Sequence, residues 1–577
     1  MNTLRKIASV LTASQKIRIL ILFLMTIILT FLEILSIGSV PILVSTVIAG
    51  NAEFIGSNML NQLISGTDFK IVCLFVVIIF ILKNLFVMFY NYFNYNLNYR
   101  ININLSKKIF KEYLYSNYLT LSKIKTSDMI RNLTTEVGGF VSCINNFIAV
   151  FRDAFLLLSI LILIIAILDF KFFLIFSVFL IITVLFYLLI KNFLKKIGEQ
   201  TVLLRSKYIE TVTDSFQLIK EIIINAKRNF FINKYYKNLE LTEKNNLKSF
   251  FIFASGKSVF EIIAVVMMIS IILFLYNKEY EITFIISYLS LIGISVIRSM
   301  PLFNSILTSL NKLEYKKPSI NVIINLIEFT KNNKEQFLVV EDLKKNDKEK
   351  ITFNKKIKIN NLTFKYNENV ILDSLSLEIN KGEKIALVGP SGSGKTTLTN
   401  ILSGLIKLNN KELLVDDVAI TENNYENYRE LISLMPQESY LMNETIENNI
   451  FFGSDQESKE TNMTKIQELL NTVNAIKFIN NLTKKEKEII KEGGTNISGG
   501  EKQRILFARS LYKKFELLIL DEPTSSLDKE NSFEIVNNIF KKYQSKTILM
   551  VTHKIDDKIK FDRILTIENG KIKEYIK

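Results

Sequence analysis

Six stretches of the chain are apolar for long enough to cross a lipid bilayer. They lie near residues 18–47, 71–97, 140–168, 171–194, 251–276 and 282–309. About 20 apolar residues in a helix span the hydrocarbon core. Inside lipid the backbone must satisfy its own hydrogen bonds, which a helix does. We therefore expect residues 1–310 to form an all-α, polytopic membrane domain with six transmembrane helices.

Basic residues fall mainly in two of the connections between these stretches. Residues 98–139 carry seven Lys or Arg and residues 191–250 carry twelve, whereas the other connections carry one each. Because basic loops stay on the cytoplasmic side, we expect both loops and both termini to be cytoplasmic. The helical pattern predicts that the loops extend the membrane helices, with tips near 117–127 and 215–226. Residues 49–70 predict either a short amphipathic helix on the outer surface or an ordinary loop.

Composition narrows the classes of partner. The chain has 577 residues, a formal net charge of +16 and a mean hydropathy of +0.24. A basic chain with apolar spans favours contact with anionic lipid, and the sequence has no nucleic-acid-binding motif. Its two cysteines have no motif spacing, which argues against a disulfide framework or a cysteine metal site.

Ionisable side chains inside the apolar stretches need an explanation, because each costs on the order of 3 kcal/mol to insert. The stretches contain Glu33, Lys83, Arg152, Asp153, Lys257, Glu261 and Arg298. We expect Arg152 and Asp153 to neutralise partners on neighbouring helices. Lys83, Lys257 and Arg298 come from three helices at middle-to-inner depth. These three cations predict a cavity for an anionic headgroup. The alternative is that they form internal ion pairs or extend their charged ends to the inner membrane surface.

A phosphate-binding loop opens the second domain. After a polar linker over residues 311–355, residues 356–577 have an α/β pattern. There the strand Lys384–Val388 precedes a helix that we expect to begin at Leu398. The residues between them are Gly389, Pro390, Ser391, Gly392, Ser393, Gly394, Lys395, Thr396 and Thr397. This P-loop NTPase motif predicts that backbone N–H groups and Lys395 bind ATP phosphates, while Thr396 ligates Mg²⁺.

Acidic residues and the only histidine follow two further strands. The apolar strand Leu517–Leu520 ends in Asp521 and Glu522, which we expect to hold Mg²⁺ and to polarise the attacking water, respectively. His553 follows the strand Thr547–Thr552. A lone histidine is often structural, but this position at the carboxyl edge of a parallel sheet favours contact with the γ-phosphate.

A second phosphate-binding helix start lies in the same domain. Ser498 precedes Gly499, Gly500 and Glu501, and we expect Ser498 to cap a helix over Lys502–Leu511. One nucleotide cannot easily use two such helix starts of a single subunit. The pattern therefore predicts a head-to-tail homodimer with ATP sandwiched between the subunits.

These motifs together resemble the nucleotide-binding domain of ABC transporters over residues 356–577. The resemblance implies that Tyr366 stacks on adenine and that Gln437 contacts Mg²⁺ and water. It also implies that Ile497–Glu501 is the signature that contacts the partner's ATP, and that the loop ending at Asp528 joins the two sites. The usual Leu and Gln are here Ile497 and Glu501. Fusion of the two domains in this order resembles exporters.

A narrower resemblance is to bacterial lipid-linked oligosaccharide flippases. It is carried by Leu32–Ile37, Ile81–Asn84 and Ile297–Pro301. It implies that Lys83, Lys257 and Arg298 contact the pyrophosphate of a polyprenyl-linked substrate in a bacterial inner membrane. Lys replaces the expected Arg at two of these positions and binds phosphate without a bidentate fork. The alternatives are an exporter of another lipid, a peptide or a drug, and a non-pumping, nucleotide-gated channel or regulator.

Overall fold

The computed structural model describes most of the chain and divides it into two compact units. The described residues are 2–49, 69–167, 170–276, 282–332, 351–366, 368–408, 412–421, 424–453, 459–553 and 555–574. One unit comprises residues 1–116 and 122–334, and the other comprises 117–121 and 335–577. The predicted outer segment 49–70 lies almost wholly outside the described residues.

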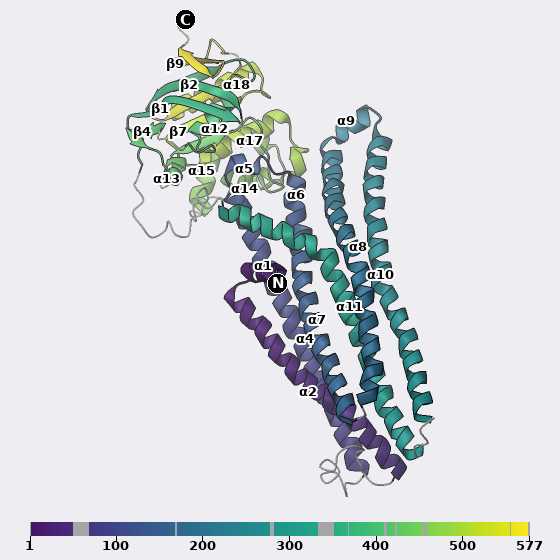
Figure 1. The fold of residues 1–577 in the computed structure, drawn as a ribbon. Helices are drawn as coiled ribbons and strands as arrows, with labels where there is room; N and C mark the ends of the chain where they lie inside the picture. The colour runs from purple at the N-terminus through teal and green to yellow at the C-terminus, as the bar shows by residue number, and fades with distance from the viewer. Residues whose placement is uncertain are drawn as a thin grey trace. The chain divides into compact units, whose positions relative to one another are not determined.

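The first unit is built from long helices (Figure 1). The long helices are α2 (Ala13–Ala49), α4 (Phe69–Leu114), α7 (Val137–Ile167), α8 (Phe170–Gln217), α10 (Arg228–Tyr276) and α11 (Ile282–Asn332). The short ones are α1 (Asn2–Val10), α6 (Thr126–Arg131), the π-helical turn η1 (Asn132–Glu136) and α9 (Ile219–Ile224). The main packing partners are α7 with α11, α2 with α4, and α8 with both α11 and α10. The basic loops do continue as helices, since α4, α8 and α10 all extend beyond the apolar stretches.

Apolar residues cover both the inner and the outer faces of these helices. On α2, Leu22 and Leu29 are buried, whereas Leu20 and Phe31 are exposed, as expected for a helix between protein and lipid. Among the described residues, three segments are long and apolar enough to cross a membrane, namely Ala13–Val44, Phe69–Leu114 and Thr126–Ile164. The count of six membrane helices therefore remains a prediction.

The segment predicted as the start of a linker belongs instead to the last long helix. Residues 311–332 continue α11, which packs on α7 and α8. Tyr315, Ile320 and Ile324 are buried along this part of the helix. A Cβ added to Gly198 of α8 would overlap the carbonyl oxygen of Tyr315, so the two helices approach closely because that position is glycine. The abundant Lys and Asn obscured this buried stripe in the sequence.

The second unit contains two sheets. Strands β1 (Lys356–Tyr366), β2 (Asn369–Asn380), β4 (Leu413–Val415) and β5 (Val418–Ala419) form an antiparallel sheet in the order β2-β1-β4-β5. The other sheet has the order β10-β9-β3-β8-β7-β6. Its strands are β3 (Lys384–Val388), β6 (Ile432–Met435), β7 (Leu517–Asp521), β8 (Thr547–Val551), β9 (Arg563–Glu568) and β10 (Lys571–Glu574). All its pairings are parallel except that of β9 with β10.

Helices cover the parallel sheet on two faces. They are α12 (Lys395–Leu402), α13 (Tyr425–Glu430), α14 (Ile446–Phe451), α15 (Lys459–Thr472), α16 (Ile476–Asn480), α17 (Gly499–Tyr512) and α18 (Lys529–Lys542), with 3₁₀ turns η3 (Lys485–Lys487) and η4 (Glu492–Gly494). Along β7, Leu517 and Ile519 join one hydrophobic cluster, whereas Leu518 and Leu520 join the other. This burial of both faces explains why the strand is continuously apolar. The unit also includes α5 (Tyr118–Leu121), whose Leu119 packs against the first cluster.

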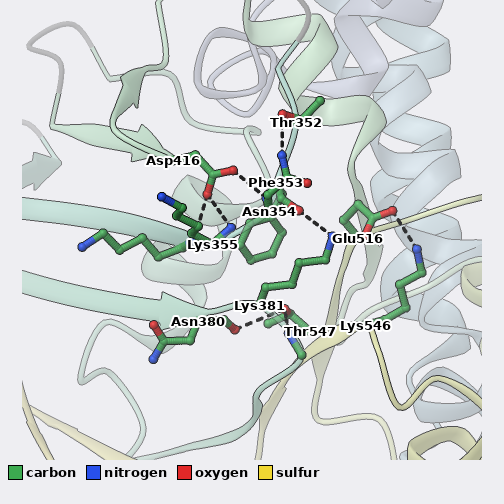
Figure 2. Close-up of polar contacts among 12 residues, drawn as sticks. Thr352, Phe353, Asn354, Lys355, Asn380, Lys381, Asp416, Glu516, Lys546 and Thr547 are labelled. Carbon is green, nitrogen blue, oxygen red and sulfur yellow. Dashed lines mark hydrogen bonds and ion pairs between the residues drawn. The ribbon is translucent and has the colours of Figure 1, made fainter.

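An aspartate fixes the chain as it enters β1. The Asp416 carboxylate accepts hydrogen bonds from the backbone N–H groups of Asn354, Lys355 and Lys356 at 2.5, 2.7 and 2.8 Å, and Figure 2 shows the first two. Burial acts to raise the pKa of Asp416, but these donors outweigh it and lower the pKa. The start of the antiparallel sheet is thereby tied to the turn between β4 and β5.

Candidate functional site

The glycine-rich loop that is predicted to bind phosphate lies between β3 and α12. Lys395 is buried, and its Nζ donates hydrogen bonds to the carbonyl oxygens of Gly389 and Pro390 at 2.7 and 2.9 Å. Gly392 and Gly394 have φ angles of +79° and +106°, which L side chains rarely adopt. The helix begins at Lys395 rather than at Leu398, because Gly394 occupies the cap position in a left-handed conformation. Thr396 is exposed at its first turn and Thr397 is buried.

The acidic residues lie at the carboxyl end of β7. Asp521 is buried at the last position of the strand. Burial raises the pKa of Asp521 to about 6, and the negative charge of Glu522 adds to this effect, while Lys395 and His553 oppose it. Glu522 has a φ of +49°, and its backbone N–H donates to the carbonyl of Val551 at 3.0 Å.

Two side chains from neighbouring strands hold the Glu522 carboxylate. His553, which follows β8, places Nε2 at 2.5 Å from Glu522 Oε1. Gln437, which follows β6, donates a hydrogen bond from Nε2 to Glu522 Oε2 at 2.9 Å. Because β6, β7 and β8 are adjacent and parallel, their carboxyl ends bring these three residues to one edge. One carboxylate is thus held from both sides, in the position where this class of sheet binds ligands.

The Ser498–Glu501 segment forms a capping box at the start of α17. The Ser498 hydroxyl accepts from the Glu501 backbone N–H at 3.3 Å, and the Glu501 carboxylate accepts from the Ser498 backbone N–H at 2.7 Å. The helix begins at Gly499, three residues before the predicted Lys502, because the two glycines already have helical geometry. None of the hydrogen bonds recorded among the described residues joins this segment to Lys395, Asp521 or Glu522.

Two further predicted residues lie on the edges of the unit. The Tyr366 side chain is partly exposed, and its ring stands edge-on to Phe364 at 5.1 Å between centroids. Asp528 caps α18 by accepting from the Asn531 backbone N–H at 2.9 Å. The hydrogen bonds from Asn531 lower the pKa of Asp528.

Charged residues meet among three helices of the first unit. Lys83 Nζ of α4 lies 2.7 Å from Glu33 Oε2 of α2, and Arg298 Nε of α11 lies 3.8 Å from Glu33 Oε1. The structure thus brings Lys83 and Arg298 together around the Glu33 carboxylate. The Lys257 side chain lies outside the described part of the chain. Arg152 and Asp153 pair with each other at 2.7 Å rather than only with other helices, and Ser305 also donates to Asp153 at 2.5 Å.

Comparison with known proteins identifies the family. Residues 372–525 match a family model described as "ABC transporter", and residues 19–306 match one described as "ABC transporter transmembrane region". The chain belongs to the ABC transporter family. A solved bacterial Atm1-family ABC exporter with ATP bound has a TM-score of 0.77 to it at 17% identity, covering 97% of this chain and 94% of that one. The fold is therefore that of an ABC exporter.

Curated relatives match this ABC transporter over part of its length. The ATP-dependent lipid A-core flippase of Syntrophus aciditrophicus is 37% identical over 221 residues, which are 38% of this chain and 36% of that protein. ABC transporter B family member 29, chloroplastic, of Arabidopsis thaliana is 34% identical over 221 residues, 38% of this chain and 34% of that protein. The chain thus spans about a third of the length of these relatives. The ATP-dependent lipid A-core flippase of Francisella novicida is 28% identical over 396 residues, 68% of this chain and 64% of that protein.

Sequence reasoning missed two residues of this ABC transporter. Glu33 was expected only as a charge in an apolar span, yet it contacts both cations. Gln503 of α17 accepts from the Ser526 backbone N–H at 3.0 Å and so ties the glycine-rich helix start to the loop before Asp528. A charge in lipid is a usable signal for Glu33, whereas no pattern in the sequence identifies Gln503.

Proposed function

We propose that this ABC transporter hydrolyses ATP and uses the energy to export or flip a lipid. The observation that carries the proposal is the Glu522 carboxylate, which His553 and Gln437 hold beside Asp521. A carboxylate fixed at this edge can accept a proton from an attacking water. His553 can contact the γ-phosphate, because its imidazole lies at the same edge of the sheet, within hydrogen-bond distance of the Glu522 carboxylate.

The two glycine-rich helix starts supply the remaining contacts to ATP. We assign ATP binding to Tyr366, Gly389, Pro390, Ser391, Gly392, Ser393, Gly394, Lys395, Thr396, Thr397, Ser498, Gly499, Gly500, Glu501 and Asp528. Lys395 would move its ammonium group from two loop carbonyls to phosphate oxygens. The N-termini of α12 and α17 both favour anions. Two copies of the chain, arranged head to tail, would each complete the other's site.

The oxygen donors at this edge suit Mg²⁺. Thr396, Gln437 and Asp521 offer a hydroxyl, an amide and a carboxylate, and Mg²⁺ usually takes one or two carboxylates along with phosphate and water. Burial, with a smaller contribution from the charge of Glu522, raises the pKa of Asp521, and a cation beside this carboxylate would favour its ionised form. When bound, Mg²⁺ would neutralise charge on the phosphates. In this arrangement Asp521 would hold Mg²⁺ and Gln437 would contact it, while the Glu522 carboxylate, positioned by His553 and Gln437, would act on the attacking water.

The substrate we propose is an anionic amphiphile. Relatives named as lipid A-core flippases support a lipid, and Lys83 and Arg298 supply cations at membrane depth. Within this class we favour a polyprenyl-pyrophosphate-linked oligosaccharide, with Lys257 as a third cation. We further propose six membrane helices in residues 1–310, a nucleotide-binding domain in 356–577, and a bacterial inner-membrane location with both termini cytoplasmic.

Reconstitution tests this function. The full chain would be placed in phosphatidylcholine vesicles with a fluorescent polyprenyl-pyrophosphate glycolipid, and movement of the headgroup would be followed by protection from a membrane-impermeant quencher. The proposal expects movement that requires ATP and is abolished by Lys83→Glu or Arg298→Glu. Unchanged movement in both variants would contradict the assignment of these cations, and ATP-independent movement would contradict energy coupling.

A further inference from the structure

A buried amide side chain links helix α17 to the loop that follows strand β7. Gln503 lies in the second turn of α17 and is 7% exposed. Its Oε1 accepts a hydrogen bond from the backbone N–H of Ser526 at 3.0 Å. Its Nε2 donates to the hydroxyl of Ser525 at 3.5 Å. The first of these bonds is the shorter and therefore the stronger, so Gln503 holds the loop mainly at Ser526.

Close packing reinforces this link. A Cβ added to Gly499 would lie 3.7 Å from Ser526 Cβ, and one added to Gly500 would lie 3.4 Å from Leu527 Cδ2. Little space therefore remains between the start of α17 and the loop. Because packed protein interiors transmit small displacements, a shift of the loop would be resisted by the helix.

The same loop holds the backbone of Glu522. The Ser525 N–H donates to the carbonyl of Glu522 at 3.4 Å, and the Leu527 N–H donates to the carbonyl of Thr524 at 3.1 Å. These two turns overlap and lead from Glu522 to the Ser526 that Gln503 holds. The Glu522 backbone is thus restrained through its carbonyl by the loop, in addition to the bond that its N–H makes to β8.

Glu522 needs such restraints because its backbone conformation is strained. Its φ of +49° lies in the left-handed region, which is unfavourable for a residue with a side chain and persists only where the surroundings fix it. If the loop lost its anchor, Glu522 could relax toward a negative φ. The relaxation would turn its carboxylate away from His553 and Gln437, which hold it in the site.

We propose that Gln503 is a positioning residue for ATP hydrolysis. By holding the Ser526 N–H it fixes the loop after β7, and the loop keeps Glu522 in the strained conformation that directs its carboxylate into the site. This inference rests on the proposed ATP hydrolysis and adds a residue that acts on the reaction through Glu522.

The separate effects on kcat and KM test this role. For the full chain in phosphatidylcholine nanodiscs with Mg²⁺ and ATP, Gln503→Leu should lower kcat about tenfold, the equivalent of one lost hydrogen bond. KM should stay within about twofold, because the loop between β3 and α12 is unchanged. A rise in KM with unchanged kcat would show that Gln503 supports the start of α17 instead, and would overturn the proposal.

A conservative variant tests the contact with Ser526. Gln503→Glu keeps an oxygen that can accept from the Ser526 N–H, so its kcat should stay within about threefold of the native value. A loss as large as that of Gln503→Leu would contradict Ser526 as the anchored group.

Combination with Glu522→Gln separates positioning from an independent effect. If Gln503 acts through the Glu522 carboxylate, removing that carboxylate first should make the second change nearly silent. Gln503→Leu should then slow single-turnover hydrolysis of radiolabelled ATP by less than about twofold. A further loss of about tenfold in the double variant would overturn the proposal.

A second buried amide controls for loss of stability. Asn424, the residue before α13, is 2% exposed, and its Oδ1 accepts from the Thr421 N–H at 2.7 Å. Asn424→Leu should lower the melting temperature at least as much as Gln503→Leu does, yet keep kcat. If kcat instead fell with melting temperature in both variants, the role of Gln503 would be structural only and the proposal would fail.

The native protein separates this inference from the function on which it rests. A native chain that does not hydrolyse ATP would defeat the proposed function and the inference together. Native hydrolysis with an unchanged kcat in Gln503→Leu would defeat this inference alone.

Discussion

His553 Nε2 lies 2.5 Å from Glu522 Oε1, although 31 positions separate the two residues in the chain. The contact exists because β7 and β8 are parallel neighbours in the sheet. Gln437 reaches the same carboxylate from β6, the strand on the other side of β7. The order of the strands in the sheet thus brings the residues of the candidate site together.

Replacing the histidine should slow hydrolysis without preventing nucleotide binding. We expect His553→Ala to lower kcat for ATP hydrolysis by about 10²- to 10⁴-fold, the usual worth of a positioned proton-transfer or orienting group. Binding of a fluorescent ATP analogue should change by less than about threefold, because the phosphate-binding loop is untouched. A variant that hydrolyses ATP at the native rate would assign His553 a purely structural role.

Two buried lysines of the second unit, Lys395 and Lys384, serve as a test residue and its control. Lys395 contacts loop carbonyls that border the phosphate site, whereas Lys384 Nζ donates to the carbonyls of Gly382, Gln544 and Lys546. We expect Lys395→Ala to weaken ATP binding by about 10- to 100-fold, since charged hydrogen bonds contribute about 1.5–3 kcal/mol. Lys384→Ala should instead lower the melting temperature, measured by calorimetry, and keep ATP affinity. The reverse pattern would contradict both assignments.

Two glycines of the loop between β3 and α12 should differ in how well they tolerate replacement by alanine. Both Gly392 and Gly394 have positive φ, but a Cβ at Gly394 would come within 2.8 Å of Leu372 Cδ2, while a Cβ at Gly392 would meet nothing within 4 Å. We expect Gly392→Ala to cost about 1 kcal/mol and Gly394→Ala about 2–3 kcal/mol. Chemical unfolding of the full chain measures the difference, and equal costs would show that backbone strain alone decides.

Asp521 should make stability depend on pH. Its pKa is raised to about 6 in the folded state, so the folded state binds the proton more tightly than the unfolded state does. Stability should then fall as pH rises through the window from about 4 to 6. Without nucleotide or Mg²⁺, Asp521→Asn should stabilise the protein at pH 8 by about 1–2 kcal/mol, with allowance for solvent screening. Calorimetry at pH 4 and pH 8 measures this, and a gain of equal size at both values would exclude the ionisation of Asp521 as its source.

Local patterns predicted the strands well and the helix starts less well. The strand Lys384–Val388 has the predicted bounds because its burial on both faces leaves a continuous apolar run. The helices after the two glycine-rich segments begin three residues early, at Lys395 and Gly499. In both cases the backbone around the glycines already has the geometry of a helix start. Helix propensities of single residues do not describe this geometry.

Contacts between distant segments could not be predicted. The pairing of Glu33 with Lys83 and Arg298 depends on how α2, α4 and α11 pack together. Each charge was visible in the sequence, but the sequence left cavity and ion pair open as alternatives. The polar segment 311–355 was wrong as a linker over its first 22 positions, because Lys316 and Lys317 stand between the buried Tyr315 and Ile320 and obscure the apolar pattern.

The central claim is that Glu522 catalyses ATP hydrolysis in this chain. The most direct measurement is the steady-state release of phosphate by the full-length protein in lipid nanodiscs with Mg²⁺ and ATP, compared with Glu522→Gln. We predict turnover by the native protein and a loss of at least about 10²-fold in the variant, with ATP still bound. A native protein that releases no phosphate, or a variant that matches its rate, would contradict the account.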